Sequence, residues 1–294
     1  MVGRNAQTST SHARRVTTTV TKDSAPQKSS PTTSEIEKYQ RDGVVVLRNV
    51  LSQEIIHDLA NAVETNMSAP GKWANEYAAN SQQGRFFDDY VNWSRFAAYK
   101  QVALSGVLPS LALALMQKTS GRFFHEHVLV KEAGNNQVTP WHNDDPYYGI
   151  NSSQNVSIWV PLDPIPEEIA LRAIAGSHRW NKNFIPRKFV DQSPYASTAD
   201  GYEPLPDSKD LDNQSGIEVF PAMPGDVVAF HFRTVHSAPA TSHYDGRRRV
   251  VSFRYVDSDA TWATRPWRTS PPLEPISLQP GDLLIDDRFP LISL

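Results

Sequence analysis

The chain has 294 residues, of which 39% are hydrophobic and 10% aromatic, so it is long enough to bury a sizeable core. Its formal net charge of −3 predicts no strong attraction to nucleic acid or to a membrane surface. The absence of cysteine excludes disulfides, thiolate metal sites and thiol nucleophiles. No apolar run approaches the length of a membrane span, and no signal-peptide core is visible. These features predict a mildly acidic, soluble protein.

The first 33 residues differ in composition from the rest of the chain. They contain thirteen Ser or Thr, five Lys or Arg and a single acidic residue, Asp23, with few large apolar side chains. Such a segment cannot bury enough surface to offset its ordering entropy, so we expect residues 1–33 to be a disordered tail and residues 34–294 to form one domain. A cytoplasmic location is expected; the alternative is a mitochondrial one, with residues 1–33 as a transit peptide.

Three helices and a strand are predicted in the N-terminal part of this domain. A capping-box pattern from Ser34 to Glu37 opens a short helix, and residues 44–50 have the composition of a strand. Ser52 is expected to cap an amphipathic helix, and Ser105 a further apolar one. These helices would flank the domain that follows.

An aromatic, irregular stretch lies between residues 71 and 95. Two interpretations are open for it: core packing beneath a long loop, or one wall of a binding pocket, because such pockets are mostly apolar with an aromatic lining. Its aromatic residues are Trp73, Tyr77, Phe86, Phe87, Tyr90 and Trp93.

From residue 122 onward, short strand-like segments are separated by Pro and Gly. They span residues 123–131, 156–162, 216–220, 226–232 and 249–256. Many short strands with frequent turn signals favour a closed or two-sheet β architecture. We therefore expect a mainly β fold with flanking helices, its core a double-stranded β-helix (a cupin-like jelly-roll). The Pro-rich segment after Thr264 is expected to wrap the outside.

A candidate metal site lies in two separate motifs. His142 and Asp144 form a His-x-Asp pair, and alternate residues of an extended strand face the same side. His236 would supply a second histidine from another strand. Two histidines and one carboxylate form a three-ligand face with open positions, which is typical of non-haem Fe(II) oxygenases. His231 is the alternative third ligand, although strand alternation places it and His236 on opposite faces.

A cluster of arginines follows twelve residues after His236. Arg248 lies in a segment of strand composition, where a fixed cation could bind the distal carboxylate of a keto-acid co-substrate that chelates the metal. Arg247 and Arg249 are the alternatives, because strand alternation determines which of the three faces inward.

Several further motifs occur in order along the chain. They are Asp42-Gly43-Val44-Val45-Val46-Leu47, His127-Val128-Leu129-Val130-Lys131-Glu132, Thr139-Pro140-Trp141-His142-Asn143-Asp144, Val156-Ser157-Ile158-Trp159-Val160-Pro161-Leu162-Asp163, Ala175-Gly176-Ser177-His178 and Gly225-Asp226. From about residue 36 to residue 272 the sequence resembles the phytanoyl-CoA dioxygenase family of Fe(II)/2-oxoglutarate oxygenases. The resemblance implies that His142, Asp144 and His236 bind iron, that Arg248 clamps 2-oxoglutarate, and that Trp159 walls the co-substrate pocket.

Three residues alternate along one predicted strand and could face the same interior. His127 occupies a position that the family directs inward, and Lys131 is a candidate contact for a carboxylate. His125 and His127 could form a second metal pair, but no carboxylate has suitable spacing to complete it. Ala238 stands where many members carry a hydroxyl residue, so Ser237 or Thr241 could supply the hydroxyl instead.

The predicted function is that of a dioxygenase that uses Fe(II), 2-oxoglutarate and O2. It would hydroxylate an unactivated C–H bond of a hydrophobic small molecule, such as a secondary metabolite or a lipid-derived acid, and release succinate and CO2. Two alternatives remain: a cupin-like metal enzyme that does not use 2-oxoglutarate, and a non-catalytic jelly-roll binding protein. Neither the substrate nor the oligomeric state follows from the sequence.

Overall fold

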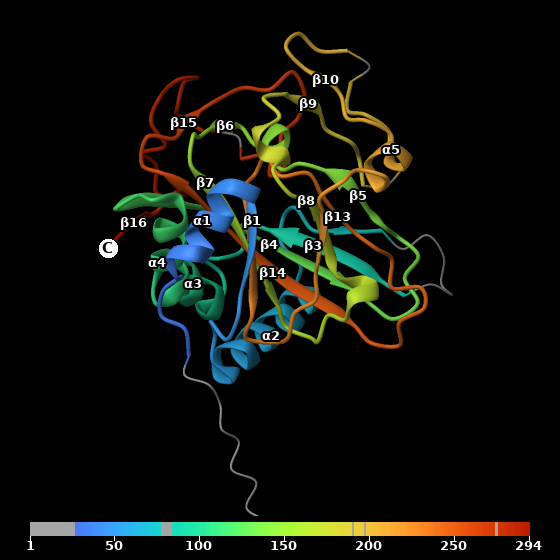
Figure 1. The fold of residues 1–294 in the computed structure, drawn as a ribbon. Coiled ribbons are helices and arrows are strands. Elements are labelled where there is room, and N and C mark those ends of the chain that lie inside the picture. The colour runs from blue at the N-terminus through green and yellow to red at the C-terminus, as the bar shows by residue number, and fades with distance from the viewer. Residues whose placement is uncertain (1–26, 78–83, 190, 197, 274–275) are drawn as a thin grey trace, which may run out of the picture.

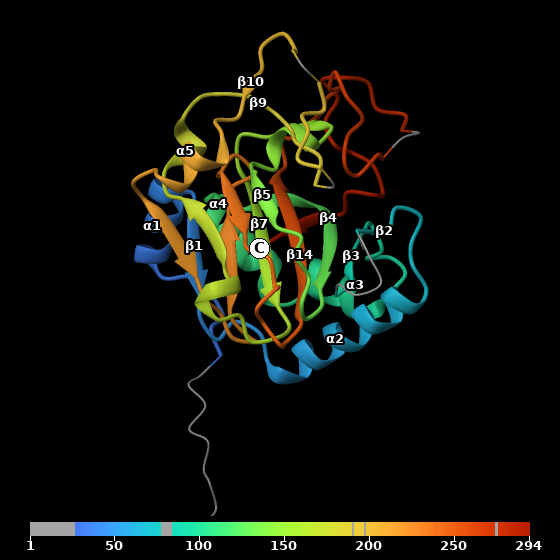
Figure 2. The same ribbon diagram turned by 90° about the vertical axis from the view of Figure 1, so that its right-hand side faces the viewer.

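The computed structural model describes residues 27–77, 84–189, 191–196, 198–273 and 276–294. Two antiparallel sheets face each other, and helices cover the outer face of the larger sheet (Figures 1 and 2). The mainly β architecture with flanking helices is therefore confirmed.

The larger sheet has the strand order β1-β12-β7-β14-β4-β3-β2, and β16 also pairs with β4. Its strands are β1 (Val44–Leu47), β2 (Asn75–Glu76), β3 (Phe86–Tyr90), β4 (Ser120–Lys131), β7 (Asn155–Pro161), β12 (Val227–Phe230), β14 (Arg248–Asp257) and β16 (Leu291–Ser293). The smaller sheet has the order β11-β8-β13-β5. Its strands are β5 (Thr139–His142), β8 (Leu171–Ile174), β11 (Ile217–Phe220) and β13 (His236–Ala238). Two short pairs complete the strands: β6 (Ile150–Asn151) with β15 (Thr261–Trp262), and β9 (Phe184–Ile185) with β10 (Glu203–Pro204).

Side chains of the larger sheet alternate between two environments. On β14, Val251, Phe253 and Tyr255 point into a core shared with the helices, whereas Val250 packs in a second cluster between the sheets. Because successive side chains of a strand face opposite sides, one face of this sheet is free to line a cavity. Burying each of the aromatic side chains on the helix-covered face contributes about 2 kcal/mol or more to stability.

Side-chain caps start α1 and α2, whereas α3, α4 and α5 begin without one, and two predicted helix starts are wrong. The helices are α1 (Thr33–Asp42), α2 (Gln53–Ser68), α3 (Ala97–Leu104), α4 (Val107–Met116) and α5 (Ser208–Asp212). Ser52 caps α2 as predicted. The capping box of α1 is formed by Thr32 and Glu35, which have the same spacing as the predicted pair but lie two residues earlier. Ser105 ends α3 instead of capping α4, because Gly106 has a φ of 80° that interrupts the helical path.

Part of the segment expected to be a disordered tail lies within the structure. Residues 1–26 are outside the described residues. The backbone N–H of Lys28 donates to the carbonyl of Asn49 at 2.7 Å, and the Gln27 side chain donates to the carbonyl of Val50 at 2.8 Å. The ordered chain therefore includes residues before position 34.

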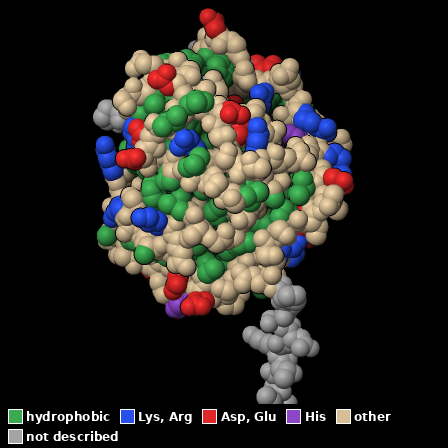
Figure 3. All heavy atoms as spheres, turned by 90° about the vertical axis from the view of Figure 1, so that its left-hand side faces the viewer, with side chains coloured by type: hydrophobic (Ala, Val, Ile, Leu, Met, Phe, Trp, Pro, Cys, Tyr) green, Lys and Arg blue, Asp and Glu red, His purple; other side chains and the backbone are tan. Residues whose placement is uncertain are grey.

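The stretch Ala97–Met116 is long and apolar enough, by length and composition alone, to cross a membrane. In the structure it is divided between α3 and α4, and more than half of its most apolar part is buried. Both helices pack in the core against the larger sheet. Core helices of this kind pass the same test of length and composition. On the face shown in Figure 3, acidic and basic side chains are interspersed among hydrophobic ones.

The Pro-rich C-terminal segment does more than wrap the outside, which corrects the prediction. Leu273, Leu284 and Phe289 are buried in one cluster with Phe124 and Tyr148. The strand β16 pairs with β4, and residues 268–270 and 272 line the cavity described below. The segment is therefore part of the framework of the site.

Candidate metal centre and its cavity

A cavity of about 440 Å³ lies between the two sheets. Side chains of both sheets and of the C-terminal segment line it. The structure brings all seven of the predicted site residues to its wall: His127, Lys131, His142, Asp144, Trp159, His236 and Arg248.

His142 and His236 are directly opposite each other in the antiparallel pair of β5 and β13. Their ring centroids are 4.2 Å apart. The Nε2 atoms of His142 and His236 lie 3.6 and 3.9 Å from the same oxygen, Oδ1 of Asp144. All three side chains are buried, and their candidate ligand atoms lie within 4.8 Å of one another.

The hydrogen bonds of the two histidines leave their Nε2 atoms free for a metal. Nδ1 of His142 lies 2.8 Å from the carbonyl of Pro140, and Nδ1 of His236 lies 2.9 Å from the carbonyl of Thr234. A carbonyl only accepts, so each Nδ1 carries the hydrogen and each Nε2 presents a lone pair. Burial, assisted by the nearby His142, lowers the pKa of His236 to about 3, so its ring is neutral. The Nε2 atoms of two imidazoles and a carboxylate oxygen therefore fit a divalent metal with open positions.

Asp144 reaches this site in a different way from the one predicted. The strand β5 ends at His142, and Asp144 has helical dihedral angles, with φ −76° and ψ −34°. Its backbone N–H donates to the carbonyl of Phe232 at 2.7 Å. The carboxylate is therefore positioned by a turn that is hydrogen-bonded to the loop between β12 and β13. Strand alternation does not explain its direction.

Two residues that sequence reasoning missed hold the Asp144 carboxylate. The Ser157 hydroxyl donates to Oδ2 at 3.0 Å, and Nη2 of Arg254 lies 3.5 Å from the same oxygen. Burial alone would raise the pKa of Asp144, but the Arg254 guanidinium and the two histidines hold it well below its usual value. These contacts occupy Oδ2 and leave Oδ1 facing the histidines. Arg254 could have been found, because it has the same strand parity as Arg248.

A second pair of cations lies on the wall of the same cavity. Arg248 and Lys131 are opposite each other in the pair of β14 and β4, and both are buried. Nη1 of Arg248 donates to the carbonyls of Ile169 and Pro239, and Nζ of Lys131 donates to Gln137 and Thr139. Within the described ranges, neither side chain pairs with a carboxylate.

Burial is the main influence on the pKa values of these two cations. Burial lowers the pKa of Arg248 to about 10. Burial and the neighbouring Arg248 also lower the pKa of Lys131 well below its usual value. In the described part of the chain these two buried cations have no acidic partner, which costs free energy that an anion in the cavity would recover.

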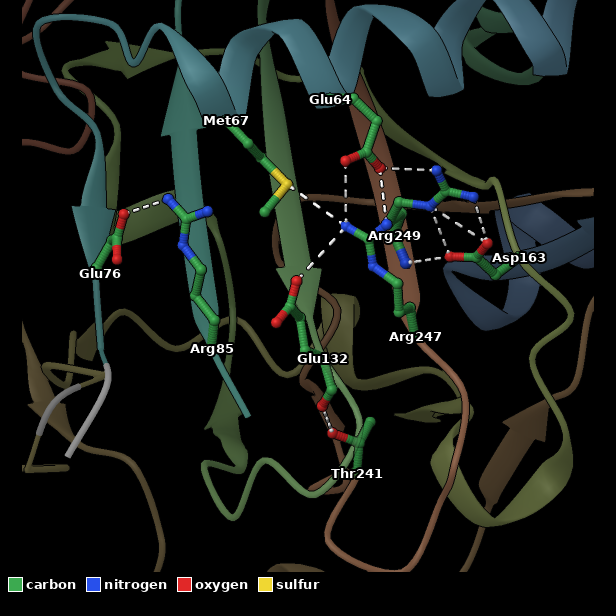
Figure 4. A network of polar contacts seen from close by, with 9 residues as sticks. All are labelled: Glu64, Met67, Glu76, Arg85, Glu132, Asp163, Thr241, Arg247 and Arg249. Atoms are coloured by element: carbon green, nitrogen blue, oxygen red, sulfur yellow. Dashed lines mark hydrogen bonds and ion pairs between the residues drawn. The ribbon is translucent and has the colours of Figure 1, made fainter. Parts of the chain in front are cut away.

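Arg249 of β14 and Arg247, which directly precedes this strand, point away from the cavity and toward α2 (Figure 4). Nη1 of Arg247 lies 2.8 Å from Glu64 on α2, and Nη1 of Arg249 lies 2.9 Å from the same carboxylate. Arg249 also pairs with Asp163 at 2.6 Å. Of the three neighbouring arginines, Arg248 is therefore the one that lines the cavity.

The other polar residues that the sequence singled out are also placed. His231 packs beside His178, with ring centroids 5.4 Å apart, and does not line the cavity. Ser237 and Ala238 line the cavity, and the Ser237 hydroxyl accepts from Arg172 at 3.3 Å. The Thr241 hydroxyl donates to the carbonyl of Glu132, away from the cavity.

The aromatic stretch between residues 71 and 95 contributes both to the wall of the cavity and to the core. Phe86 and Tyr90 of β3 line the cavity together with Trp73 and Tyr77, whereas Phe87 packs in the core beneath the helices. The alternation of β3 therefore divides the stretch between a cavity wall and the core.

Known proteins resemble both the sequence and the fold. The model of the phytanoyl-CoA dioxygenase (PhyH) family matches residues 39–250. The non-heme alpha ketoglutarate dependent carbocyclase SnoK from nogalamycin biosynthesis superposes with a TM-score of 0.71, at 25% identity over 90% of this chain and 97% of that chain. The alpha ketoglutarate dependent epimerase SnoN, from the same biosynthesis, gives a TM-score of 0.68, at 21% identity over 89% and 95% of the two chains. EctD from S. alaskensis, in its structure with 2-oxoglutarate and 5-hydroxyectoine, gives 0.64, at 15% identity over 87% of each chain.

These likenesses agree with the architecture of two facing sheets and confirm the predicted double-stranded β-helix core. The matched range includes the three residues of the metal centre and ends two residues beyond Arg248. Because the family model spans most of the chain, this protein belongs to the phytanoyl-CoA dioxygenase (PhyH) family.

Proposed function

We propose that this protein is an Fe(II)- and 2-oxoglutarate-dependent dioxygenase that oxidises a C–H bond of a small molecule. His142, Asp144 and His236 would hold the iron. When bound, iron supplies the coupling of O2 reduction and 2-oxoglutarate decarboxylation, to succinate and CO2, with oxidation of the substrate.

The observation that carries the proposal is a pair of buried cations that have no carboxylate partner among the residues that the structure describes. Arg248 and Lys131 lie on the wall of the cavity that contains the metal centre. A dicarboxylate that reaches from the metal to Arg248 would place its distal carboxylate against a planar guanidinium, which binds carboxylates in a bidentate manner. Trp159 is buried on the same wall and would cover the apolar carbons of the co-substrate.

Electrostatics at the cavity also support an anionic co-substrate. Lys72, Lys188 and Arg268 are exposed side chains that line the cavity, and so they lie toward its opening. Cations at the mouth of a cleft raise the local concentration and the association rate of an anion.

Hydroxylation of a secondary metabolite is the specific reaction that we propose. SnoK and SnoN are proteins of nogalamycin biosynthesis, and the EctD structure contains 5-hydroxyectoine together with 2-oxoglutarate. The apolar and aromatic lining of the cavity suits a small organic molecule. In this proposal the chain binds and orients that molecule and excludes water from the metal centre.

Anaerobic absorption spectroscopy tests the metal and co-substrate sites together. Fe(II) and then 2-oxoglutarate would be added to the purified protein, with His142→Ala as the variant and His57→Ala, at an exposed position of α2, as the matched control. We expect a visible charge-transfer band that requires both additions, is kept in the control and is absent from His142→Ala. Iron binding without the band would favour a metal enzyme that does not use 2-oxoglutarate. Failure to bind iron would favour a non-catalytic protein.

A further inference from the structure

Three polar atoms on the cavity wall have no partner among the described residues: Nε2 of His125, Oδ1 of Asp88 and the Ser252 hydroxyl oxygen. The hydroxyl can both donate and accept, so it can adapt to a ligand, whereas the other two atoms serve as acceptors. His125 is 1% exposed and Asp88 is 3% exposed, and both line the cavity. A buried acceptor without a partner is energetically unfavourable, so Nε2 of His125 and Oδ1 of Asp88 point to a ligand that supplies hydrogen-bond donors.

The hydrogen bonding of His125 determines what its free nitrogen offers. Nδ1 lies 3.0 Å from the carbonyl of Glu126, so Nδ1 carries the hydrogen and Nε2 presents a lone pair. Burial, together with the nearby Arg254, lowers the pKa of His125 well below its usual value and keeps the ring neutral. Tyr148 and Tyr90 approach the ring at centroid distances of 5.4 and 6.4 Å and restrict its rotation. Nε2 is therefore a fixed acceptor.

Asp88 is oriented by two neighbours that use only one of its oxygens. Nε2 of His127 lies 3.1 Å from Oδ2, and the Tyr77 hydroxyl donates to the same oxygen at 3.4 Å. His127, for which we considered a role in a metal pair, instead holds this carboxylate; the described metal cluster consists of His142, Asp144 and His236. The carboxylate is thus held in place while Oδ1 stays available to a ligand.

The register of the larger sheet places the two acceptors at different distances from the metal centre. His125 is opposite Arg254 in the pair of β4 and β14, and Arg254 contacts the metal-centre residue Asp144. Asp88 lies one strand farther away, opposite Leu129 in the pair of β3 and β4. Strand geometry therefore separates the two acceptors by a distance on the order of 10 Å. One ligand of moderate size could reach both from a position beside the metal centre.

We propose that the substrate carries hydrogen-bond donors on an apolar frame, with a hydroxyl or amine against His125 Nε2 and another against Asp88 Oδ1. The inference rests on the proposed function, because it describes the substrate of the same cavity. Trp73, Phe86 and Tyr90 would cover the apolar frame. A site that hydrogen-bonds a donor discriminates strongly against an analogue without it, since the acceptor is then left unpaired. The two acceptors would therefore determine which molecules are oxidised.

Matched probes can test this inference without metal or turnover. Binding of 4-phenylcyclohexanol, its methyl ether and 4-phenylcyclohexylamine to the full-length protein would be measured by ligand-observed NMR in the presence of a chelator. The three probes share one frame and differ in whether the polar group donates. We expect the alcohol and the amine to bind at least tenfold more tightly than the ether. Equal affinities of the alcohol and the ether would overturn the inference, and no variant is needed for that comparison.

Two variants assign the preference to the two residues. His125→Phe keeps a ring but removes the acceptor, and we expect it to reduce the preference for alcohol over ether severalfold or more. Asp88→Asn keeps the shape but removes the charge, and should weaken amine binding about tenfold. His57→Phe and Asp58→Asn make the same changes at exposed positions of α2 and should leave all affinities unchanged. Unchanged ether affinity verifies that each cavity variant retains the folded cavity.

The outcomes separate this inference from the proposed function. If the Fe(II)/2-oxoglutarate band fails to form but the donor preference persists, the proposed function is wrong and the donor-binding wall stands. If the band forms while the alcohol and the ether bind equally, the inference alone is overturned. A donor preference that survives both cavity variants would show that other residues produce it, and would also overturn the assignment.

Discussion

Arg254 joins Tyr148 to the carboxylate of the metal centre: its Nη2 lies 3.5 Å from Oδ2 of Asp144, and its Nε donates to the Tyr148 hydroxyl. All three side chains are buried. The guanidinium is fixed by the hydroxyl on one side and orients the carboxylate on the other. The side-chain contacts of Asp144 therefore preorganise its Oδ1 toward the two histidines.

Arg254→Met tests this orientation. We expect the affinity for Fe(II) to fall about tenfold or more, because partners that orient metal ligands typically contribute 10–100-fold. Anaerobic metal titration would measure the affinity, with Arg247→Met, which directly precedes β14 and points away from the cavity, as the matched control. Unchanged affinity in a variant with a native circular dichroism spectrum would contradict the orienting role.

Arg248→Met should raise thermal stability while it weakens the binding of 2-oxoglutarate. The variant removes a buried cation that has no acidic partner within the described ranges, so we expect Tm to rise by about 2 °C or more in the absence of 2-oxoglutarate. The KM for 2-oxoglutarate should rise by about 100-fold, while Fe(II) affinity stays unchanged. Thermal melts and succinate-release kinetics would measure both effects. Arg249→Met is the control, and should lower Tm because it breaks the ion pairs with Glu64 and Asp163.

Metal removal should lower thermal stability by an amount that depends on metal concentration. A ligand that binds only the native state at 100 times its Kd stabilises that state by about 2.7 kcal/mol. Adding Fe(II) anaerobically, or Zn(II) in air, should therefore raise Tm, and a chelator should reverse the change. His236→Ala should lose the response. A full response in His236→Ala would place the metal elsewhere.

Acid pH should destabilise the metal-free protein through its buried histidines. Burial lowers the pKa of His231 to about 3, whereas an unfolded histidine titrates near pH 6.5. Between these values the unfolded state binds the extra proton, so the free energy of unfolding falls as pH falls from about 6.5 toward 3. This histidine contributes at most about 1.4 kcal/mol per pH unit. Above about pH 6.5 this histidine is unprotonated in both the folded and the unfolded state, so it causes no loss of stability there.

Urea denaturation at pH 7.5, 6.0 and 5.0 measures this dependence. His231→Gln should show a shallower loss of stability below pH 6.5, by the equivalent of one proton. His57→Gln, at an exposed position, should follow the wild-type curve. If His231→Gln and the wild type lose stability in parallel, His231 is not the titrating group.

Local patterns predicted the parts of the site that depend on short-range geometry. The spacing of His142 and Asp144 predicted their pairing, although Asp144 reaches the site through a turn and not by strand alternation. Alternation predicted that one of Arg247, Arg248 and Arg249 faces inward, and the structure shows that it is Arg248. Arg254 carried the same signal as Arg248 and was overlooked. The helix starts at Ser34 and Ser105 were misassigned, because competing residues nearby offered an equivalent cap or a break.

Asp88 could not have been predicted from local patterns. It reaches the cavity because β3 pairs with β4 across more than thirty residues, and nothing near Asp88 in the sequence indicates that register. The contribution of residues 268–270 is similar, since their position depends on how the C-terminal segment packs against Phe124 and Tyr148. Long-range strand pairing and loop packing, rather than local propensity, determined these parts of the site.

The alternation of β3 has a consequence for how the protein can evolve. Asp88 and Tyr90 face the cavity, while Phe87 packs in the core and Asp89 accepts hydrogen bonds from Asn66 and Gly71. Substitutions at every second position of β3 can therefore change which ligands the cavity binds. The intervening positions remain available to preserve folding. A combinatorial library confined to these alternate positions would explore new substrates with few losses to misfolding.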